Sequence, residues 1–173
     1  LQKVQKSKNS PAKELLDISL DAEEYTVTFV ANGQTVTRKA LFDWSKEDNE
    51  RIRYYSGTAI YKTTFPWKYK EQKDRQVYLH LGTVYNLATV RVNGIDCGTV
   101  WTAPYRADIT AALKKGTNEL EIEVTNTWAN ALKGTDEGKA PFEGIWTNAK
   151  YRKQENTLLP GGLLGPLYLE QSN

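Results

Sequence analysis

The stretch Gly116-Thr117-Asn118-Glu119-Leu120-Glu121-Ile122-Glu123-Val124-Thr125 decides the fold of this chain. Its apolar residues, at positions 120, 122 and 124, alternate with glutamates at positions 119, 121 and 123. Successive side chains of a β-strand point to opposite faces of a sheet, so this segment buries one face and exposes the other. Residues 115–118, just before the alternating segment 119–124, are typical of a turn. The stretch therefore predicts a half-buried antiparallel strand.

The same period of two recurs on either side of this stretch. Apolar side chains alternate with polar ones in residues 25–29, 77–81 and 88–92, and residues 59–65 are β-rich with a less regular alternation. The pattern indicates further half-buried strands. Residues 167–169 predict a short closing strand.

Turn signals separate these segments. Asn32-Gly33 and Asn93-Gly94 suit tight hairpins, because such turns need positive φ angles. We expect one short helical turn, within residues 109–114, where Asp108 or Thr110 accepts backbone N–H groups and Ile109 enters the core. Strands at this spacing without amphipathic helices between them indicate an all-β fold, an antiparallel β-sandwich or jelly roll.

Composition and charge exclude several classes of protein. The chain has 173 residues, 39% hydrophobic and 25% charged, as in ordinary globular proteins. No run approaches the ~20 consecutive apolar residues of a membrane-spanning helix, so we expect no membrane partner. The first fourteen residues hold four lysines and one glutamate, and the net charge of the whole chain is only +2. The remaining residues are therefore slightly acidic, and we expect no nucleic-acid partner.

These patterns predict the domain organisation. Residues 1–14 are polar and lack periodicity, as in a linker or disordered tail. Residues 15–173 then form a single β-sandwich domain. The chain contains no methionine and begins without an apolar signal segment, so we expect it to be a piece of a longer precursor.

Cysteine and histidine are too rare for several kinds of site. Cys97 and His80 are each the sole residue of their type. An internal disulfide, a cysteine-based zinc site and a histidine-pair metal motif are excluded. We expect no metal and no cofactor, and His80 is expected on a strand, facing solvent or a neighbouring strand.

Residues 127–166 differ from the rest of the chain. They contain several glycines and prolines together with Trp128 and Trp146. A long Gly/Pro-rich excursion that carries aromatic residues indicates a functional loop or an interface that covers a sheet.

The order of several short motifs is more specific than any one of them. The motifs are Asp43-Trp44-Ser45, Tyr55-Ser56-Gly57-Thr58-Ala59, Ala88-Thr89-Val90-Arg91-Val92-Asn93-Gly94, Cys97-Gly98-Thr99-Val100-Trp101 and Leu158-Leu159-Pro160-Gly161-Gly162-Leu163-Leu164-Gly165-Pro166. Over about residues 40–170 this order resembles a galactose-binding-like jelly-roll domain. It is similar to the sugar-binding domain of glycoside hydrolase family 2 and, more closely, to the C-terminal domain of family 106 α-L-rhamnosidases.

The resemblance implies a setting for the chain. It implies a galactose-binding-domain-like sandwich within a larger bacterial glycoside hydrolase, located in the periplasm or outside the cell. It also implies that the catalytic acids belong to a separate barrel domain, which is then a partner in the same polypeptide.

A sugar presents an apolar C–H face and a rim of hydroxyl groups, so a binding site combines an aromatic ring with hydrogen-bonding side chains. The ligand-binding candidates are Trp101, Tyr105, Arg106, Asn126, Trp128, Asn130, Glu143 and Trp146. The alternative for each tryptophan is core packing or a domain interface, and Tyr105 is a core or rim residue. For Arg106 and Asn126 the alternative is a hydrogen bond that holds a turn. Trp44 and Trp67 are interpreted as structural.

Catalysis within this chain is not expected. Glycoside hydrolysis needs two carboxyl groups about 5–5.5 or 6.5–9.5 Å apart. The three glutamates of the 116–125 strand share a solvated face, and no motif selects a pair among Asp136, Glu137 and Glu143 in the Gly-rich segment. The chain is also too short for a catalytic barrel of ~250 residues. No catalytic residue is predicted.

Three functions remain open: a non-catalytic carbohydrate-binding or accessory domain of a larger glycoside hydrolase, an autonomous carbohydrate-binding module, and a ligand-free scaffold that packs on the catalytic domain.

Overall fold

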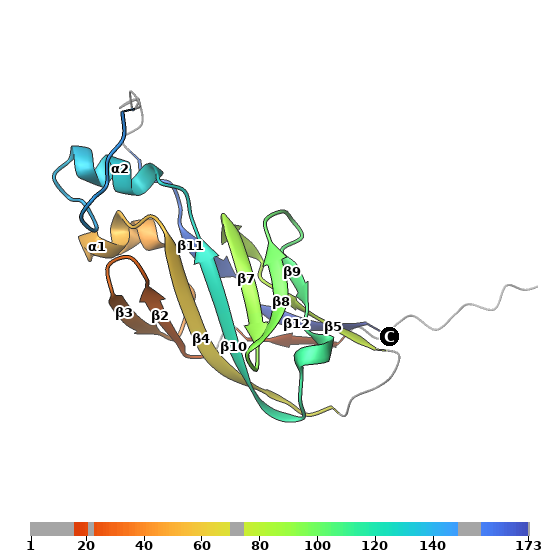
Figure 1. Ribbon diagram of the computed structural model, residues 1–173. Coiled ribbons are helices and arrows are strands. Elements are labelled where there is room, and N and C mark those ends of the chain that lie inside the picture. Colours follow the sequence, from red (N-terminus) through yellow and green to blue (C-terminus); the bar gives the residue numbers. More distant parts are fainter. Residues whose placement is uncertain (1–15, 21–22, 70–74, 149–156, 173) are drawn as a thin grey trace, which may run out of the picture.

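The computed structural model describes residues 16–20, 23–69, 75–148 and 157–172. The predicted linker, residues 1–14, lies outside the described residues. The described chain is an all-β sandwich of antiparallel sheets (Figure 1). This confirms the predicted fold class.

The larger sheet has six strands. Their order is β3 (Gln34–Arg38), β2 (Tyr25–Phe29), β4 (Thr58–Trp67), β10 (Gly116–Thr125), β7 (Leu87–Val92) and β8 (Ile95–Val100). The strand predicted over residues 119–124 lies within β10, which begins earlier, inside the predicted turn, because residues 116–118 also pair with β4. β10 is at the centre of the sheet and pairs with β4 over its whole length and with β7 from Leu120 onward. Leu120, Ile122 and Val124 are buried, as the alternation predicts.

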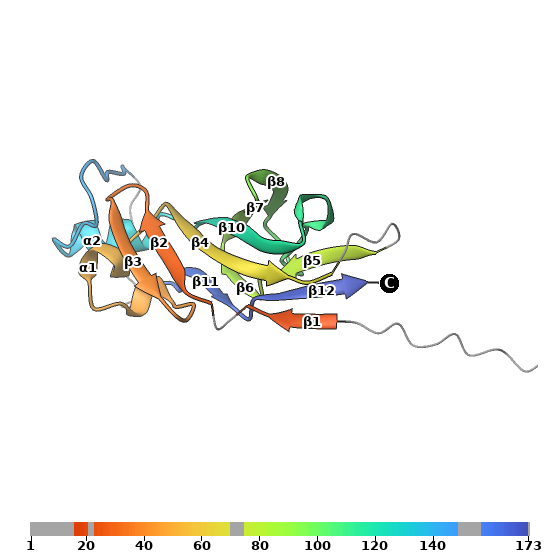
Figure 2. The same ribbon diagram turned by 90° about the horizontal axis from the view of Figure 1, so that it is seen from below.

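The smaller sheet faces the larger one. Its order is β1 (Leu16–Ser19), β12 (Tyr168–Ser172), β5 (Gln76–His80) and β9 (Arg106–Asp108). Figure 2 shows β1, β12 and β5 side by side. A two-stranded ribbon, β11 (Gly162–Gly165) with β6 (Thr83–Tyr85), completes the fold. The apolar faces of the two main sheets form one core cluster.

Two of the motifs that carry the family resemblance meet in the core. Asp43 Oδ1 accepts the backbone N–H of Gly161 (3.0 Å), and the Trp44 N–H donates to the Gly161 carbonyl (3.0 Å). The buried Trp44 indole donates to the Tyr61 hydroxyl (2.7 Å). Gly162 has φ +101°, and a Cβ there would overlap the Trp44 indole. These motifs therefore build the fold, and Trp44 is structural as predicted.

The helical content is larger than expected. The predicted turn exists as a 3₁₀ turn, η2 (Thr110–Ala112), which Asp108 caps through the Thr110 N–H (3.0 Å), with Ile109 buried. The expectation of one helical turn was nevertheless wrong. The structure also contains η1 (Trp44–Lys46), α1 (Glu50–Arg53) and α2 (Ala129–Asp136).

Tertiary contacts explain the missed helix α2. It has no side-chain N-cap and contains Gly134, so its local signals are weak. Its position depends on remote groups: the Ala131 N–H donates to the Ser56 hydroxyl (3.0 Å), and Gly134 lies where a Cβ would crowd the Tyr54 ring. No helix among the described residues is long and apolar enough to cross a membrane.

Candidate functional site

Both helices lie at one end of the sandwich, beside the β2–β3 turn (Figure 1, upper left). The same end holds the first residue of β4 and the last of β10, since Thr58 pairs with Thr125. An open hollow of about 680 Å³ lies there. The β2–β3 turn, α1, the end of α2 and residues 140–145 form its walls.

Asn32 holds the walls of the hollow together. Its Nδ2 donates to the backbone carbonyls of Arg51 (2.8 Å) and Pro141 (3.3 Å), and its Oδ1 accepts the Gln34 N–H (3.1 Å). One side chain thereby connects the β2–β3 turn with α1 and with the 140–145 segment. The sequence shows Asn32 only as a turn residue.

A second set of contacts, a hydrogen bond and an ion pair, connects α1 with the end of α2. Tyr54 donates its hydroxyl to Glu137 (2.7 Å), and Lys139 pairs with Glu50 (3.2 Å). The hydrogen bond to Glu137, with burial as a smaller cause, raises the pKa of Tyr54. The ion pair with Glu50 raises the pKa of Lys139. These contacts hold the residues that line the hollow.

The described lining of the hollow includes one aromatic residue, Phe142, and two charged residues, Arg51 and Glu143. Phe142 lies edge-on to Tyr55 (centroids 5.9 Å apart) and to Trp128 (6.1 Å). Arg51 and Glu143 also line the hollow, together with Ile145. Arg51 and Phe142 carry no sequence signal of a site, because the contacts that bring them together are made by residues far apart in the chain.

All three candidate tryptophans are exposed, so core packing, one of their two alternatives, does not apply. Trp128 is 57% exposed and Trp146 is 80% exposed. Neither ring lines the hollow itself, but Trp128 lies edge-on to Phe142 and Trp146 follows Ile145, and both Phe142 and Ile145 line it. Trp101 is 75% exposed and lies at the same end, because β8 ends beside the start of β7, but it does not line the hollow.

Asn126 and Asn130 make structural contacts. Asn126 accepts the Gly57 N–H (2.8 Å) and donates to the Tyr55 carbonyl (3.0 Å), the turn-holding role given as its alternative. The buried Asn130 donates to the carbonyl of Leu159 (2.7 Å) and accepts its N–H (2.8 Å). Neither amide faces the hollow as a free hydrogen-bonding group.

Tyr105 and Arg106 lie elsewhere. Tyr105 is half-buried, and its carbonyl accepts the Leu81 N–H (2.8 Å). Arg106 is on β9, where its guanidinium lies 4.5 Å from the centre of the Tyr78 ring. On the neighbouring strand pair, His80 stacks on Tyr168 (4.5 Å) with Nε2 2.6 Å from Glu170, so it faces a neighbouring strand.

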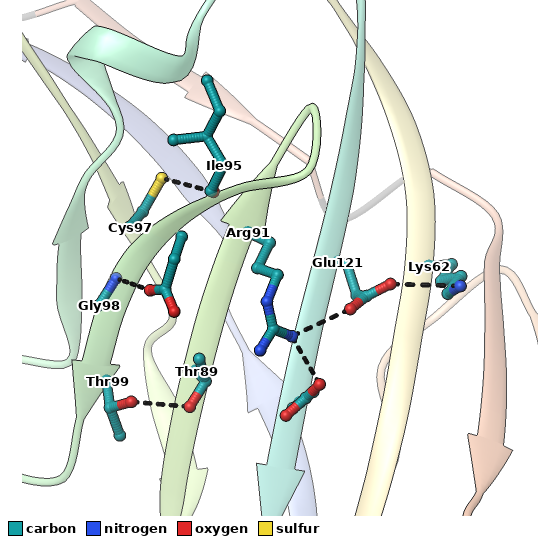
Figure 3. A network of polar contacts seen from close by, with 10 residues as sticks. Lys62, Thr89, Arg91, Ile95, Cys97, Gly98, Thr99 and Glu121 are labelled. Atoms are coloured by element: carbon teal, nitrogen blue, oxygen red, sulfur yellow. Dashed lines mark hydrogen bonds and ion pairs between the residues drawn. The ribbon is translucent and has the colours of Figure 1, made fainter.

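Two of the three glutamates of β10, Glu121 and Glu123, form a network of ion pairs on the outer face of the larger sheet (Figure 3). Arg91 Nη1 lies 3.1 Å from Glu121 and 2.5 Å from Glu123, and Lys62 lies 3.2 Å from Glu121. Their charges satisfy one another, which supports the interpretation as a solvated face.

Comparison with known proteins places this geometry in a family. Residues 34–158 match the family model described as "Glycosyl hydrolase 2 galactose-binding domain-like". A protein of Formosa agariphila, provisionally named a β-glucuronidase, is 36% identical over 84% of this chain and 15% of its own length.

Solved structures of glycoside hydrolases contain a similar domain. The rhamnosidase from Novosphingobium sp. PP1Y superposes with a TM-score of 0.81 at 35% identity, over 98% of this chain and 16% of that chain. The FMN-binding β-glucuronidase from Facaelibacterium prausnitzii L2-6 gives 0.61 at 25% identity, over 91% of this chain and 22% of that chain. The chain thus spans less than a quarter of the length of each of these relatives.

Proposed function

Because this chain belongs to the glycosyl hydrolase 2 galactose-binding domain-like family, we propose that it is a non-catalytic accessory domain that contacts carbohydrate at the hollow beside α2. Its relatives are much longer chains with glycoside hydrolase names, of which it matches a small part. The catalytic domain is then a partner in the same polypeptide, and the bacterial periplasm or the cell exterior is the expected location.

One observation carries the proposal: two exposed tryptophans lie next to residues that line a hollow whose charged side chains are one cation, Arg51, and one anion, Glu143. Trp128 and Trp146 offer ring faces to the C–H side of a sugar. Arg51 supplies hydrogen-bond donors and Glu143 supplies acceptors for hydroxyl groups. A soluble domain rarely leaves two tryptophans in water without a contact to make.

The positions of the carboxylates support the non-catalytic part of the proposal. Within the part of the chain that the structure describes, Glu143 is the one carboxylate that lines the hollow. Glu137 nearby is bound to Tyr54, and Glu121 and Glu123 are bound to Arg91 on another face. Hydrolysis of a glycosidic bond generally needs two carboxyl groups across the bond.

Calorimetric titration of the 173-residue chain with neutral and acidic oligosaccharides tests the proposal. We expect weak binding that Trp128→Ala and Trp146→Ala each reduce about tenfold or more, with the fold intact by circular dichroism. Trp101→Ala is the matched control, because Trp101 is also exposed (75%) at the same end but, unlike Trp128, makes no ring contact with Phe142 and, unlike Trp146, does not adjoin a residue that lines the hollow. Equal losses in all three variants, or no binding of any sugar, would contradict the proposal.

A second function, a ligand-free scaffold, is favoured by a different observation. Among the described residues, five of the six large exposed apolar side chains lie at this end; they are Val30, Trp101, Trp128, Trp146 and Leu159. None of these five side chains lines the hollow itself. Such a cluster suits a contact with a neighbouring domain.

The full-length protein separates these possibilities. If the exposed apolar cluster at this end of the sandwich only contacts a neighbouring domain, Trp101→Ala and Leu159→Ala will lower the melting temperature of the full-length protein. They will not lower that of the 173-residue chain. An autonomous binding module would instead bind sugar equally well alone and in the full-length protein.

A further inference from the structure

The charges of the hollow bear on which sugar it takes. Arg51 and Glu143 are its only charged lining residues among those described. Its other side chains, including Asn32, Phe142 and Ile145, are neutral. The walls therefore carry one positive and one negative group and no net charge.

These two groups are not paired within the described part of the chain. Among the described residues, the Arg51 guanidinium makes one long hydrogen bond, to the Asn32 carbonyl (3.4 Å), and Glu143 has no ion-pair or hydrogen-bond partner. Other charges nearby are paired, as Lys139 is with Glu50. Arg51 and Glu143 thus face the same hollow with their hydrogen-bonding capacity almost unused.

Neighbouring hydroxyl groups of a sugar match this pair of side chains. A guanidinium only donates hydrogen bonds and an ionised carboxylate only accepts them, whereas a hydroxyl does both. A sugar hydroxyl can accept from Arg51, and a neighbouring hydroxyl can donate to Glu143. A sugar carboxylate is attracted to Arg51 but repelled by the negative Glu143, and because it only accepts hydrogen bonds it offers Glu143 no donor.

On this basis we propose that the hollow selects an uncharged pyranose with adjacent hydroxyl groups and discriminates against uronic acids. This inference rests on the proposed function. The names of the relatives do not decide the question, since they include a rhamnosidase and β-glucuronidases. The charges that line the hollow carry the argument.

Methyl β-D-glucoside and methyl β-D-glucuronide form a matched pair of probes, because they differ only in the group at C6. Titrations of the 173-residue chain, followed by calorimetry or by tryptophan fluorescence, should show the glucoside bound about fivefold more tightly or better. Glu143→Gln should lower or reverse the ratio of glucoside to glucuronide affinity, because it removes the repulsion between Glu143 and the carboxylate of the glucuronide. Arg51→Gln should weaken the binding of both probes.

Glu119→Gln is the control for net charge. Glu119 is an exposed carboxylate on the outer face of β10, away from the hollow, so its loss should leave the ratio unchanged. Tighter binding of the glucuronide, or a ratio that Glu143→Gln and Glu119→Gln shift equally, overturns the inference while carbohydrate binding itself stands. Failure of both probes and of all longer oligosaccharides overturns the proposed function as well.

Discussion

At the scale of single residues, two glycines with the same backbone angle occupy different surroundings. Gly162 (φ +101°) lies against the Trp44 indole, whereas Gly98 (φ +98°) in β8 has no atom within 4 Å of the place that a Cβ would take. Gly98 lies where the pairing of β7 with β8 shifts register, which agrees with the bulge expected there. Both positions favour glycine, but only Gly162 also needs the space.

Alanine at Gly98 measures the cost of backbone strain alone, whereas alanine at Gly162 adds the overlap of its Cβ with Trp44. Gly98→Ala should lower the free energy of unfolding by about 1–2 kcal/mol, because of the positive φ alone. Gly162→Ala should cost about 1–3 kcal/mol more, since Trp44 cannot move without breaking its hydrogen bond to Tyr61. Urea denaturation measures both values, and equal losses would show that the contact with Trp44 contributes nothing.

At the scale of elements, the contacts that connect α1 with the end of α2 depend on Tyr54 and Lys139, which lose their protons in alkali. The pKa of Tyr54 is raised by its hydrogen bond to Glu137, and the pKa of Lys139 is raised by Glu50. A group whose pKa is higher in the folded state stabilises the fold below its unfolded pKa, and this contribution disappears as the pH rises through the folded value. Tyr54 and Lys139 therefore stop stabilising the fold above about pH 10.

Unfolding experiments between pH 8 and pH 11 test this behaviour. Tyr54→Phe and Glu137→Gln should be less stable than the wild-type chain at pH 8, and the difference should shrink at pH 11. Glu119→Gln removes a carboxylate with no tyrosine bonded to it and should keep the wild-type profile. A constant difference at all pH values would mean that the Tyr54–Glu137 contact does not titrate as described.

The element scale also shows what sequence patterns can predict. Alternation identified β2, β5, β7 and β10, because a half-buried strand repeats every two residues whatever its neighbours are. It missed α1 and α2, which are both short. α1 carries a local signal, since Asn49 accepts the Arg51 N–H at its start, whereas α2 is held by Asn130 and Ser56 through contacts with remote residues. A helix stabilised mainly by tertiary contacts leaves little trace in its own residues.

At the scale of the whole molecule, one core cluster joins both main sheets. We therefore expect a single cooperative unfolding transition, with the slowest amide exchange in β4, β10 and β7 at the centre of the six-stranded sheet. Deleting residues 1–14, the predicted linker, should leave the melting temperature within about 1 °C of the full chain. A second transition, or a loss of several degrees on deletion, would contradict the prediction of one domain spanning residues 15–173.

The candidate site illustrates the limit of prediction from sequence at this scale. Of the candidates in the Gly/Pro-rich stretch, Glu143 lines the hollow, Trp128 contacts the lining residue Phe142, and Trp146 follows the lining residue Ile145. Arg51 and Asn32 were not candidates, although the hollow depends on both. Asn126 and Asn130 hold the backbone instead, and Tyr105 and Arg106 lie outside the hollow.

The amino-acid sequence by itself determined the regularly alternating strands, the β-sandwich class and the family resemblance, because the period of two and the turn residues act within a few positions of the chain. The short strands β1, β6, β9 and β11 carry no such pattern and were not predicted. Only the tertiary structure decided where the hollow lies and which residues face it. Asn32 and Pro141 are 109 positions apart, and Asp43 and Gly161 are 118 apart. No local pattern predicts such contacts, since each forms only after the sheets have packed and placed distant loops at the same end of the sandwich.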